Sequence, residues 1–185
     1  MAELLEIRWH GRGGLGAVTS AELVARAAIS EGKCAQSFPS FGPERRGAPV
    51  IAFLRISDEF IRTRTPIDEP DVVVVLDPGL LRVIDVTSGL KENGKIIINS
   101  RKSPAELKSE FGYKWLVAAV NATIIARETI GMPITNTGMI GALLKVAEVV
   151  RLDSVVEQLQ ERFGTRAKGN IEAMKRAYKE TVIEE

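Results

Sequence analysis

The sequence predicts an α/β fold in which a Rossmann-like sheet, mostly parallel, is flanked by helices and followed by a helical C-terminal end. Three observations predict it. Residues 4–9 alternate apolar and polar side chains, run into a glycine turn and continue as a helical pattern to about Ile29. Residues 71–76 and 95–99 contain β-branched apolar runs, which are typical of parallel strands covered on both faces. From about Ile140 onward the apolar residues recur at helical spacing.

The remaining elements follow in order along a single predicted domain, residues 1–185. We expect strands near 33–38, at 50–56 and at 114–119, and a short helix capped by Ser103 with a proline in its first turn. Three amphipathic helical segments follow, the second behind an expected Asp153 cap. Their apolar faces are Ile140, Leu143, Ala147 and Val150; Val155, Val156, Leu159 and Phe163; and Ile171, Met174, Tyr178 and Val182.

Composition argues against several classes of protein. The 25 Lys and Arg residues nearly balance the 24 Asp and Glu residues, so the positive charge expected of a dedicated nucleic-acid binder is missing. The first residues lack a basic segment followed by a long apolar run, and no stretch approaches the roughly 20 apolar residues that span a bilayer. We therefore expect no nucleic-acid partner, no membrane partner and a cytoplasmic location.

The glycine turn is the clearest local motif. Gly11, Gly13 and Gly16 satisfy the pattern G-x-G-x-x-G between a predicted strand and a predicted helix, whose free amide groups suit an anion. A dinucleotide site also needs an acidic residue at the end of the second strand, where this chain has Gln36-Ser37-Phe38-Pro39. A structural turn, or a site for a phosphate or partner group, is therefore favoured over dinucleotide binding, with Gly13 and Gly14 as the candidate contacts.

A loop at residues 38–49 is the second motif. Its three prolines and two glycines block both a helix and a central strand. Phe38 and Phe41 offer apolar anchors, and Glu44, Arg45 and Arg46 present charges with little conformational freedom. The loop is expected to contact a partner protein or a substrate phosphate; the alternative is a Glu–Arg pair that merely fixes the loop.

Other polar residues have a structural and a functional interpretation. His10 would hydrogen-bond at the strand end, or act as a proton donor or anion contact. Asp77 and the pair Asn99-Ser100 follow predicted strands, where open α/β sheets bind ligands, but turn and helix capping explains them equally. The single cysteine, Cys34, excludes an internal disulfide and a self-contained iron–sulfur site. We predict no catalytic residue and no metal site in this chain.

Several stretches together resemble the gamma subunit of pyruvate and related 2-oxoacid:ferredoxin oxidoreductases. Two carry most of the resemblance: residues 10–19, His-Gly-Arg-Gly-Gly-Leu-Gly-Ala-Val-Thr, and residues 38–50, which contain Glu44-Arg45-Arg46-Gly47. Residues 69–78 and 133–137, followed by Gly141-Ala142, are also similar to that family. The resemblance covers nearly the whole chain, up to about Arg151.

The resemblance implies a division of labour among subunits. Alpha and beta subunits would hold thiamine diphosphate with magnesium, and a delta-type subunit would carry iron–sulfur clusters. The complex would decarboxylate a 2-oxoacid oxidatively to an acyl-CoA and pass electrons to ferredoxin. This chain would hold no cofactor, be inactive alone and complete the architecture. Its expected partner contacts are Phe38, Phe41, Glu44, Arg45 and Arg46, and its expected anion or CoA contacts are Gly13, Gly14, Arg45 and Arg46.

Two other functions remain open at this point. One is a nucleotide-binding oxidoreductase that acts alone, and the other is a regulatory module that binds an anionic ligand at the glycine turn. Flavin absorbance or tight NAD(P) binding by the purified chain would favour the first. The choice of 2-oxoacid is expected to lie with the thiamine-bearing subunits.

Overall fold

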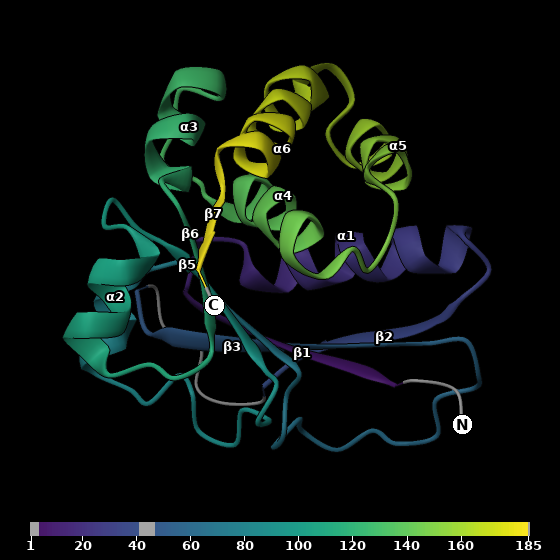
Figure 1. Cartoon of the computed structure of the whole chain (residues 1–185). Coiled ribbons are helices and arrows are strands. Elements are labelled where there is room, and N and C mark those ends of the chain that lie inside the picture. Colours follow the sequence, from purple (N-terminus) through teal and green to yellow (C-terminus); the bar gives the residue numbers. More distant parts are fainter. Residues whose placement is uncertain (1–3, 41–46, 185) are drawn as a thin grey trace.

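A computed structural model describes residues 4–40 and 47–184, which form one sheet with helices on both faces (Figure 1). In the described residues the sheet has seven strands in the order β2-β3-β1-β4-β5-β6-β7. The strands are β1 Leu5–Arg12, β2 Cys34–Pro39, β3 Pro49–Ser57, β4 Val72–Val75, β5 Lys95–Asn99, β6 Leu116–Val120 and β7 Val182–Glu184. The helices are α1 Ala17–Ser30, α2 Pro104–Phe111, α3 Ala122–Thr129, α4 Asn136–Ala147, α5 Leu152–Phe163 and α6 Ala167–Glu180, with 3-10 turns η1 Pro78–Arg82 and η2 Gly164–Arg166.

The centre of the sheet is parallel, as the sequence predicts. β1 pairs with β4, β4 with β5 and β5 with β6, all in parallel register. Every side chain of β4 is buried, because helices and connecting segments cover both faces of these strands. The predicted strands at 71–76, 95–99 and 114–119 are confirmed as β4, β5 and β6.

The predicted strand at 50–56 is confirmed as part of β3, but β3 is antiparallel to both of its neighbours. It lies between β1 and β2, with Trp9 opposite Ala52 and Phe38 opposite Phe53. Residues 40–48 alone connect β2 to β3, and a parallel connection needs a crossover of about a dozen residues or more. The short connection therefore reverses the chain and gives the sheet an antiparallel edge.

Two layers cover the sheet. The face that we call the α1 face packs against α1, α4, α5 and α6, which lie above the sheet in Figure 1, around a large core that includes Trp9, Val74 and Ile97. On the opposite face, which we call the second face, α2 covers β4, β5 and β6 through Leu107. The second face of β1, β3 and β2 carries no helix in the described residues; irregular segments after β3 and β4 cover it instead.

The helical C-terminal end is confirmed, with three corrections. Val182, expected on the last helical face, lies in β7 and is 57% exposed, because α6 ends at Glu180 and the next residues pair with β6. Asp153 is in the first turn of α5 rather than its cap: the side chain of Glu31 accepts the Arg151 amide at 2.6 Å and starts the helix earlier. Val150 follows the end of α4.

Local signals elsewhere in the chain are confirmed. Ser103 caps α2, and Glu106 completes a capping box by accepting from the Ser103 amide at 2.7 Å.

Among residues 4–40 and 47–184, none of the helices combines the length and the apolar composition that a membrane span requires.

Candidate functional site

The candidate site lies at the edge of the sheet where the parallel strands end. β1, β4, β5 and β6 are parallel, so the turn after Arg12, Asp77, Asn99 and Asn121 all lie at that edge. Open α/β sheets bind ligands there. We call this the carboxyl edge.

The glycine turn lies between β1 and α1. Gly14 and Gly16 have φ angles of +94° and +82°, which residues other than glycine adopt only at a cost in free energy. The Gly13 amide donates to the Ala48 carbonyl at 3.0 Å, so it joins the turn to the segment that leads into β3. Gly11, the first residue of the motif, lies within β1. In this structure Gly13 therefore uses its amide within the chain; contact of Gly13 or Gly14 with an anion stays a prediction.

Two helix N-termini meet beside this turn. α1 begins after Gly16 and α4 begins at Asn136, and neither has a side-chain hydrogen bond from its cap residue. A Cβ placed on Gly16 would be 2.8 Å from the Asn136 Nδ2 atom. Asn136 is 5% exposed, and its Oδ1 atom has no hydrogen-bond partner among the described residues. Helix N-termini carry partial positive charge, so this junction favours a negatively charged group.

Asp77 serves as a cap and as an ion-pair partner. Its Oδ1 atom accepts from the Gly79 amide at 2.8 Å at the start of η1, and its Oδ2 atom pairs with the Arg12 guanidinium. Arg12 also donates from Nη1 to the Gly47 carbonyl at 3.1 Å. The capping interpretation of Asp77 is confirmed, and Arg12 joins it to the glycine turn.

Asn99 holds the end of β5 to its neighbours. It is 3% exposed, and its amide nitrogen donates to the Leu76 carbonyl at 2.8 Å and to the Thr123 hydroxyl at 2.9 Å. Ser100 accepts from the Lys102 amide at 3.0 Å. Both residues line a groove of about 470 Å³ between η1, α2 and the start of α3. Asn99 therefore joins the end of β4 to the start of α3, and Ser100 makes a turn contact; ligand binding by either residue stays a prediction.

His10 is buried on the second face. It is 3% exposed, and its Nε2 atom accepts from the Arg8 Nε atom at 3.1 Å, which places the ring proton on Nδ1. Burial, followed by the charge of Arg8, lowers the pKa of His10 to about 3. The imidazole is therefore neutral at physiological pH. His10 is hydrogen-bonded, but to the Arg8 side chain of its own strand rather than as a cap of the strand end, and its Nδ1 atom has no partner among the described residues.

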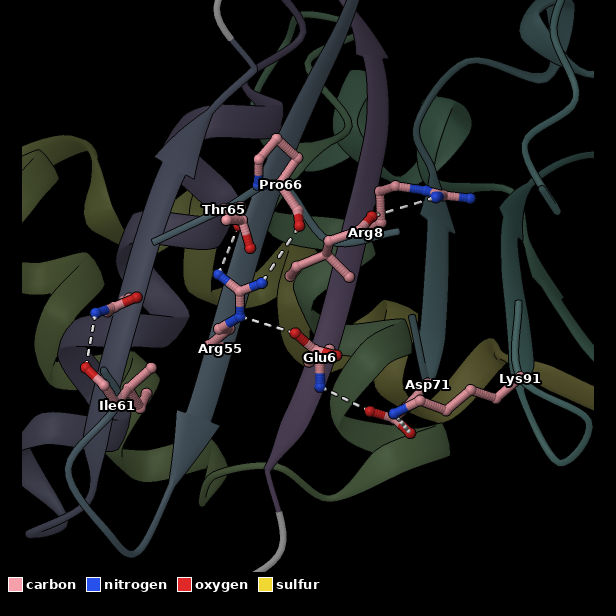
Figure 2. Close-up of polar contacts among 10 residues, drawn as sticks. Glu6, Arg8, Arg55, Ile61, Thr65, Pro66, Asp71 and Lys91 are labelled. Carbon is pink, nitrogen blue, oxygen red and sulfur yellow. Dashed lines mark hydrogen bonds and ion pairs between the residues drawn. The ribbon is translucent and has the colours of Figure 1, made fainter. Parts of the chain in front are cut away.

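Two buried arginines hold the irregular segments onto the second face (Figure 2). Arg55 is 2% exposed; it pairs with Glu6 at 2.8 Å and donates to the carbonyls of Thr65 and Pro66 at 2.8 and 3.4 Å. Arg8 donates in the same way to the carbonyls of Ile67, Val86 and Ser88. These guanidinium groups satisfy backbone oxygens that no helix or ladder pairs on this face.

The sequence interpretation gave no role to these two arginines. The signal was present, because Glu6, Arg8, His10 and Arg12 occupy alternate positions of β1 and therefore share one face of the strand. Buried charges in a strand indicate either partners or a site. Here they indicate a polar layer between the sheet and its covering segments.

The predicted partner contacts divide between described and undescribed residues. Phe38 lies in β2, half-buried, with its ring centroid 5.2 Å from that of Phe53 and 5.7 Å from the Arg55 guanidinium. Phe38 therefore makes contacts within its own chain. Phe41, Glu44, Arg45 and Arg46 lie outside the described residues. Cys34 is half-buried in β2, and among the described residues no group of three His, Cys, Asp or Glu side chains could hold a metal ion.

Both ends of the predicted loop are fixed to the sheet. The Ser40 amide donates to the Ile51 carbonyl at 2.8 Å, and the Ala48 carbonyl accepts from Gly13. The second contact brings the end of the loop to the glycine turn. The two motifs that the sequence singles out are therefore neighbours at the carboxyl edge.

Comparison with known proteins places this chain in a family. Residues 6–180 match the family model described as pyruvate ferredoxin/flavodoxin oxidoreductase. The chain is 51% identical, over 98% of its length and 100% of the relative's, to the pyruvate/ketoisovalerate oxidoreductases common subunit gamma of Thermococcus litoralis. It is 48% identical to the pyruvate synthase subunit PorC of Methanothermobacter thermautotrophicus, covering 96% of each chain.

Solved structures agree with these sequence relatives. The crystal structure of pyruvate oxidoreductase subunit PORC from Thermotoga maritima superimposes with a TM-score of 0.88 at 36% identity, covering 99% of both chains. The 2-oxoglutarate:ferredoxin oxidoreductase of Magnetococcus marinus shares the fold, with a TM-score of 0.75 at 19% identity; the match covers 96% of this chain and 30% of that longer one. The resemblance read from the motifs is confirmed: this chain belongs to the pyruvate ferredoxin/flavodoxin oxidoreductase family.

Proposed function

We propose that this chain is the gamma subunit of a multisubunit 2-oxoacid:ferredoxin oxidoreductase, with pyruvate as the first candidate substrate. The observation that carries the proposal is the end-to-end match to relatives named as gamma subunits. In the proposed reaction the 2-oxoacid loses carbon dioxide, the CoA thiol takes the acyl group, and the electrons released pass to ferredoxin.

The redox and carbanion chemistry is proposed to lie in partner subunits. Iron–sulfur clusters are usually held by four cysteine thiolates, and this chain has Cys34 alone. Its one histidine, His10, is buried and bonded to Arg8. These residues do not fit a cluster, so we assign thiamine diphosphate, magnesium and the clusters to alpha, beta and delta-type subunits. The assembly is proposed to work in the cytoplasm.

The carboxyl edge is proposed to form part of the cleft that receives CoA. CoA carries a pyrophosphate and a further phosphate, which need positive charge and donors. The converging N-termini of α1 and α4 and the turn at Gly14 support an anion at this edge. Arg45 and Arg46 belong to the loop whose C-terminal end, at Ala48, meets the same turn, and we propose them as further phosphate contacts.

The loop is also proposed as the main contact with a partner subunit. Phe38, Phe41, Glu44, Arg45 and Arg46 combine aromatic and arginine side chains, the types that most often dominate binding energy at interfaces. Its prolines reduce the ordering cost on association. Phe38 contributes through the edge strand β2, where its ring already packs on Phe53.

Reconstitution tests the proposal. The purified chain is assayed alone with thiamine diphosphate, CoA, a 2-oxoacid and an artificial electron acceptor, and then with the alpha, beta and delta-type subunits of the same organism. We expect no turnover by the chain alone and turnover by the mixture that depends on the chain. Turnover by the chain alone, or equal turnover with and without it, would contradict the proposal. Tight NAD(P) or flavin binding by the chain would instead favour an independent oxidoreductase.

A further inference from the structure

Arg12 has an unusual set of contacts for a residue at the end of a strand. Its Nε atom pairs with Asp77, and its Nη1 atom donates to the Gly47 carbonyl at 3.1 Å. One side chain thus connects β1, the end of β4 and the segment that leads into β3. An arginine suits this position because its planar fork reaches several acceptors at once.

The backbone around Arg12 explains why a side chain is needed. Arg12 is opposite Pro49 in the ladder between β1 and β3, and proline has no amide hydrogen to donate. The chain is held there by the Gly13 amide, which donates to Ala48, and by the Arg12 guanidinium on Gly47. The ladder therefore ends in a clamp of one backbone and one side-chain hydrogen bond.

Asp77 fixes the other end of this clamp. Each carboxylate oxygen has its own partner: Oδ1 accepts from the Gly79 amide and Oδ2 from Arg12. The Gly79 contact therefore orients Asp77 independently of its contact with Arg12. Rotation of the Arg12 side chain would break contacts at two segments together, so the position of the glycine turn is coupled to that of residues 47 and 48.

We propose that Arg12 is a positioning residue for CoA use: held by Asp77, it fixes the glycine turn and the Gly47–Ala48 segment in one arrangement at the carboxyl edge. This inference rests on the proposed function of the carboxyl edge. Arg12 itself acts through Gly13 and Gly47 and needs no contact with CoA. Its removal should therefore affect the use of CoA more than the use of the 2-oxoacid.

The first test uses the full chain and needs no enzyme activity. Amide hydrogen exchange at Gly13 is measured in Arg12→Ala, Arg12→Lys and the wild type. We expect exchange about tenfold faster in Arg12→Ala, because losing a charge-assisted hydrogen bond commonly costs this much in an equilibrium constant. Arg12→Lys, which keeps a charge but reaches fewer acceptors, should be intermediate. Arg26→Ala removes an exposed arginine that pairs with Glu22 on α1 and should match the wild type.

The second test uses the reconstituted complex. Arg12→Ala should raise the KM for CoA about tenfold while the KM for the 2-oxoacid and kcat stay within about twofold. Asp77→Asn, which keeps the shape but removes the charge, should give a smaller rise in the same constant. Gly32→Ala destabilises the chain at the far end of α1 and controls for general loss of stability.

The outcomes distinguish a failure of the proposed function from a failure of the inference about Arg12. Wild-type chain that supports no activity in the complex would refute the proposed function. Active complex with faster exchange at Gly13 but an unchanged KM for CoA would show Arg12 to be merely structural and overturn the inference. Unchanged exchange at Gly13 in Arg12→Ala would also overturn it, because the turn would then be held without the clamp.

Discussion

Replacement of Gly16 by alanine tests the placement of the glycine turn against α4. Gly16 has a φ angle of +82°, and an added Cβ would be 2.8, 3.0 and 3.1 Å from the Nδ2, Cβ and Cγ atoms of Asn136. Two costs therefore add. Alanine in the left-handed region costs about 1–2 kcal/mol, and overpacking against a buried side chain costs about 1–3 kcal/mol. We expect Gly16→Ala to lower the free energy of unfolding by about 2–5 kcal/mol.

Gly32 offers a matched control. Its φ angle is +84°, and no described atom lies within 4 Å of an added Cβ. Gly32→Ala should therefore show the conformational cost alone, about 1–2 kcal/mol. For a chain of this length, 1 kcal/mol lowers the melting temperature by about 2–4 °C. The expected losses are thus about 2–8 °C for Gly32→Ala and roughly 4–20 °C for Gly16→Ala.

Urea unfolding followed by circular dichroism measures both variants. The pair Gly16→Ala and Asn136→Ala completes a double-mutant cycle, because Asn136→Ala removes two of the three atoms that the new methyl group meets. We expect the double variant to be more stable than the sum of the single effects predicts. Equal losses for Gly16→Ala and Gly32→Ala, with no coupling to Asn136, would refute the close approach of the turn to α4.

Three further outcomes are expected. Gly141→Ala places a Cβ 2.1 Å from the Met174 carbonyl oxygen and should cost at least about 1–3 kcal/mol in urea unfolding, because both backbones must separate. The NMR signals of His10 should not titrate between pH 8 and 5, because the pKa of His10 in the folded chain is about 3. In the unfolded chain the imidazole titrates near 6.5, so the free energy of unfolding should fall as the pH drops from about 6.5 towards 3. This fall should be less steep in His10→Gln. Arg55→Met leaves Glu6 and two carbonyls unpaired and should cost about 3–5 kcal/mol, against under about 1 kcal/mol for the exposed Arg26→Ala.

Local patterns predicted the parts of the fold that local chemistry decides. The β-branched runs of β4 and β5 indicate strands buried on both faces. Ser103 followed by Pro104 and Glu106 indicates the start of a helix, here α2. The direction of β3 has no such local signal, because an apolar run looks alike in parallel and antiparallel pairs. Only the length of the connection, residues 40–48, indicates antiparallel pairing.

Site residues at the end of a single strand could be predicted from the sequence. Site residues brought together by the packing of distant segments could not. Asp77 comes after β4 and Asn99 ends β5, and both were found from that position alone. Asn136 lies 116 residues from Ser20, which donates to its carbonyl, so only the packing of α4 on α1 brings it to the glycine turn. Asp153 and Val182 were misassigned because contacts from Glu31 and β6 decide where α5 begins and α6 ends.

The strand order gives a physical argument against a dinucleotide site at the glycine turn. In such sites the second strand lies beside the first, and an acidic residue at its carboxyl end reaches the ribose next to the turn. Here β3 lies between β1 and β2. Because neighbouring strands are about 4.8 Å apart, the end of β2 at Pro39 is displaced from β1 by roughly twice that distance. An acidic residue at position 39 would therefore lie one strand too far from the glycine turn to reach the ribose. The inserted β3 thus argues against a solitary nucleotide-dependent enzyme, whatever residue occupies position 39.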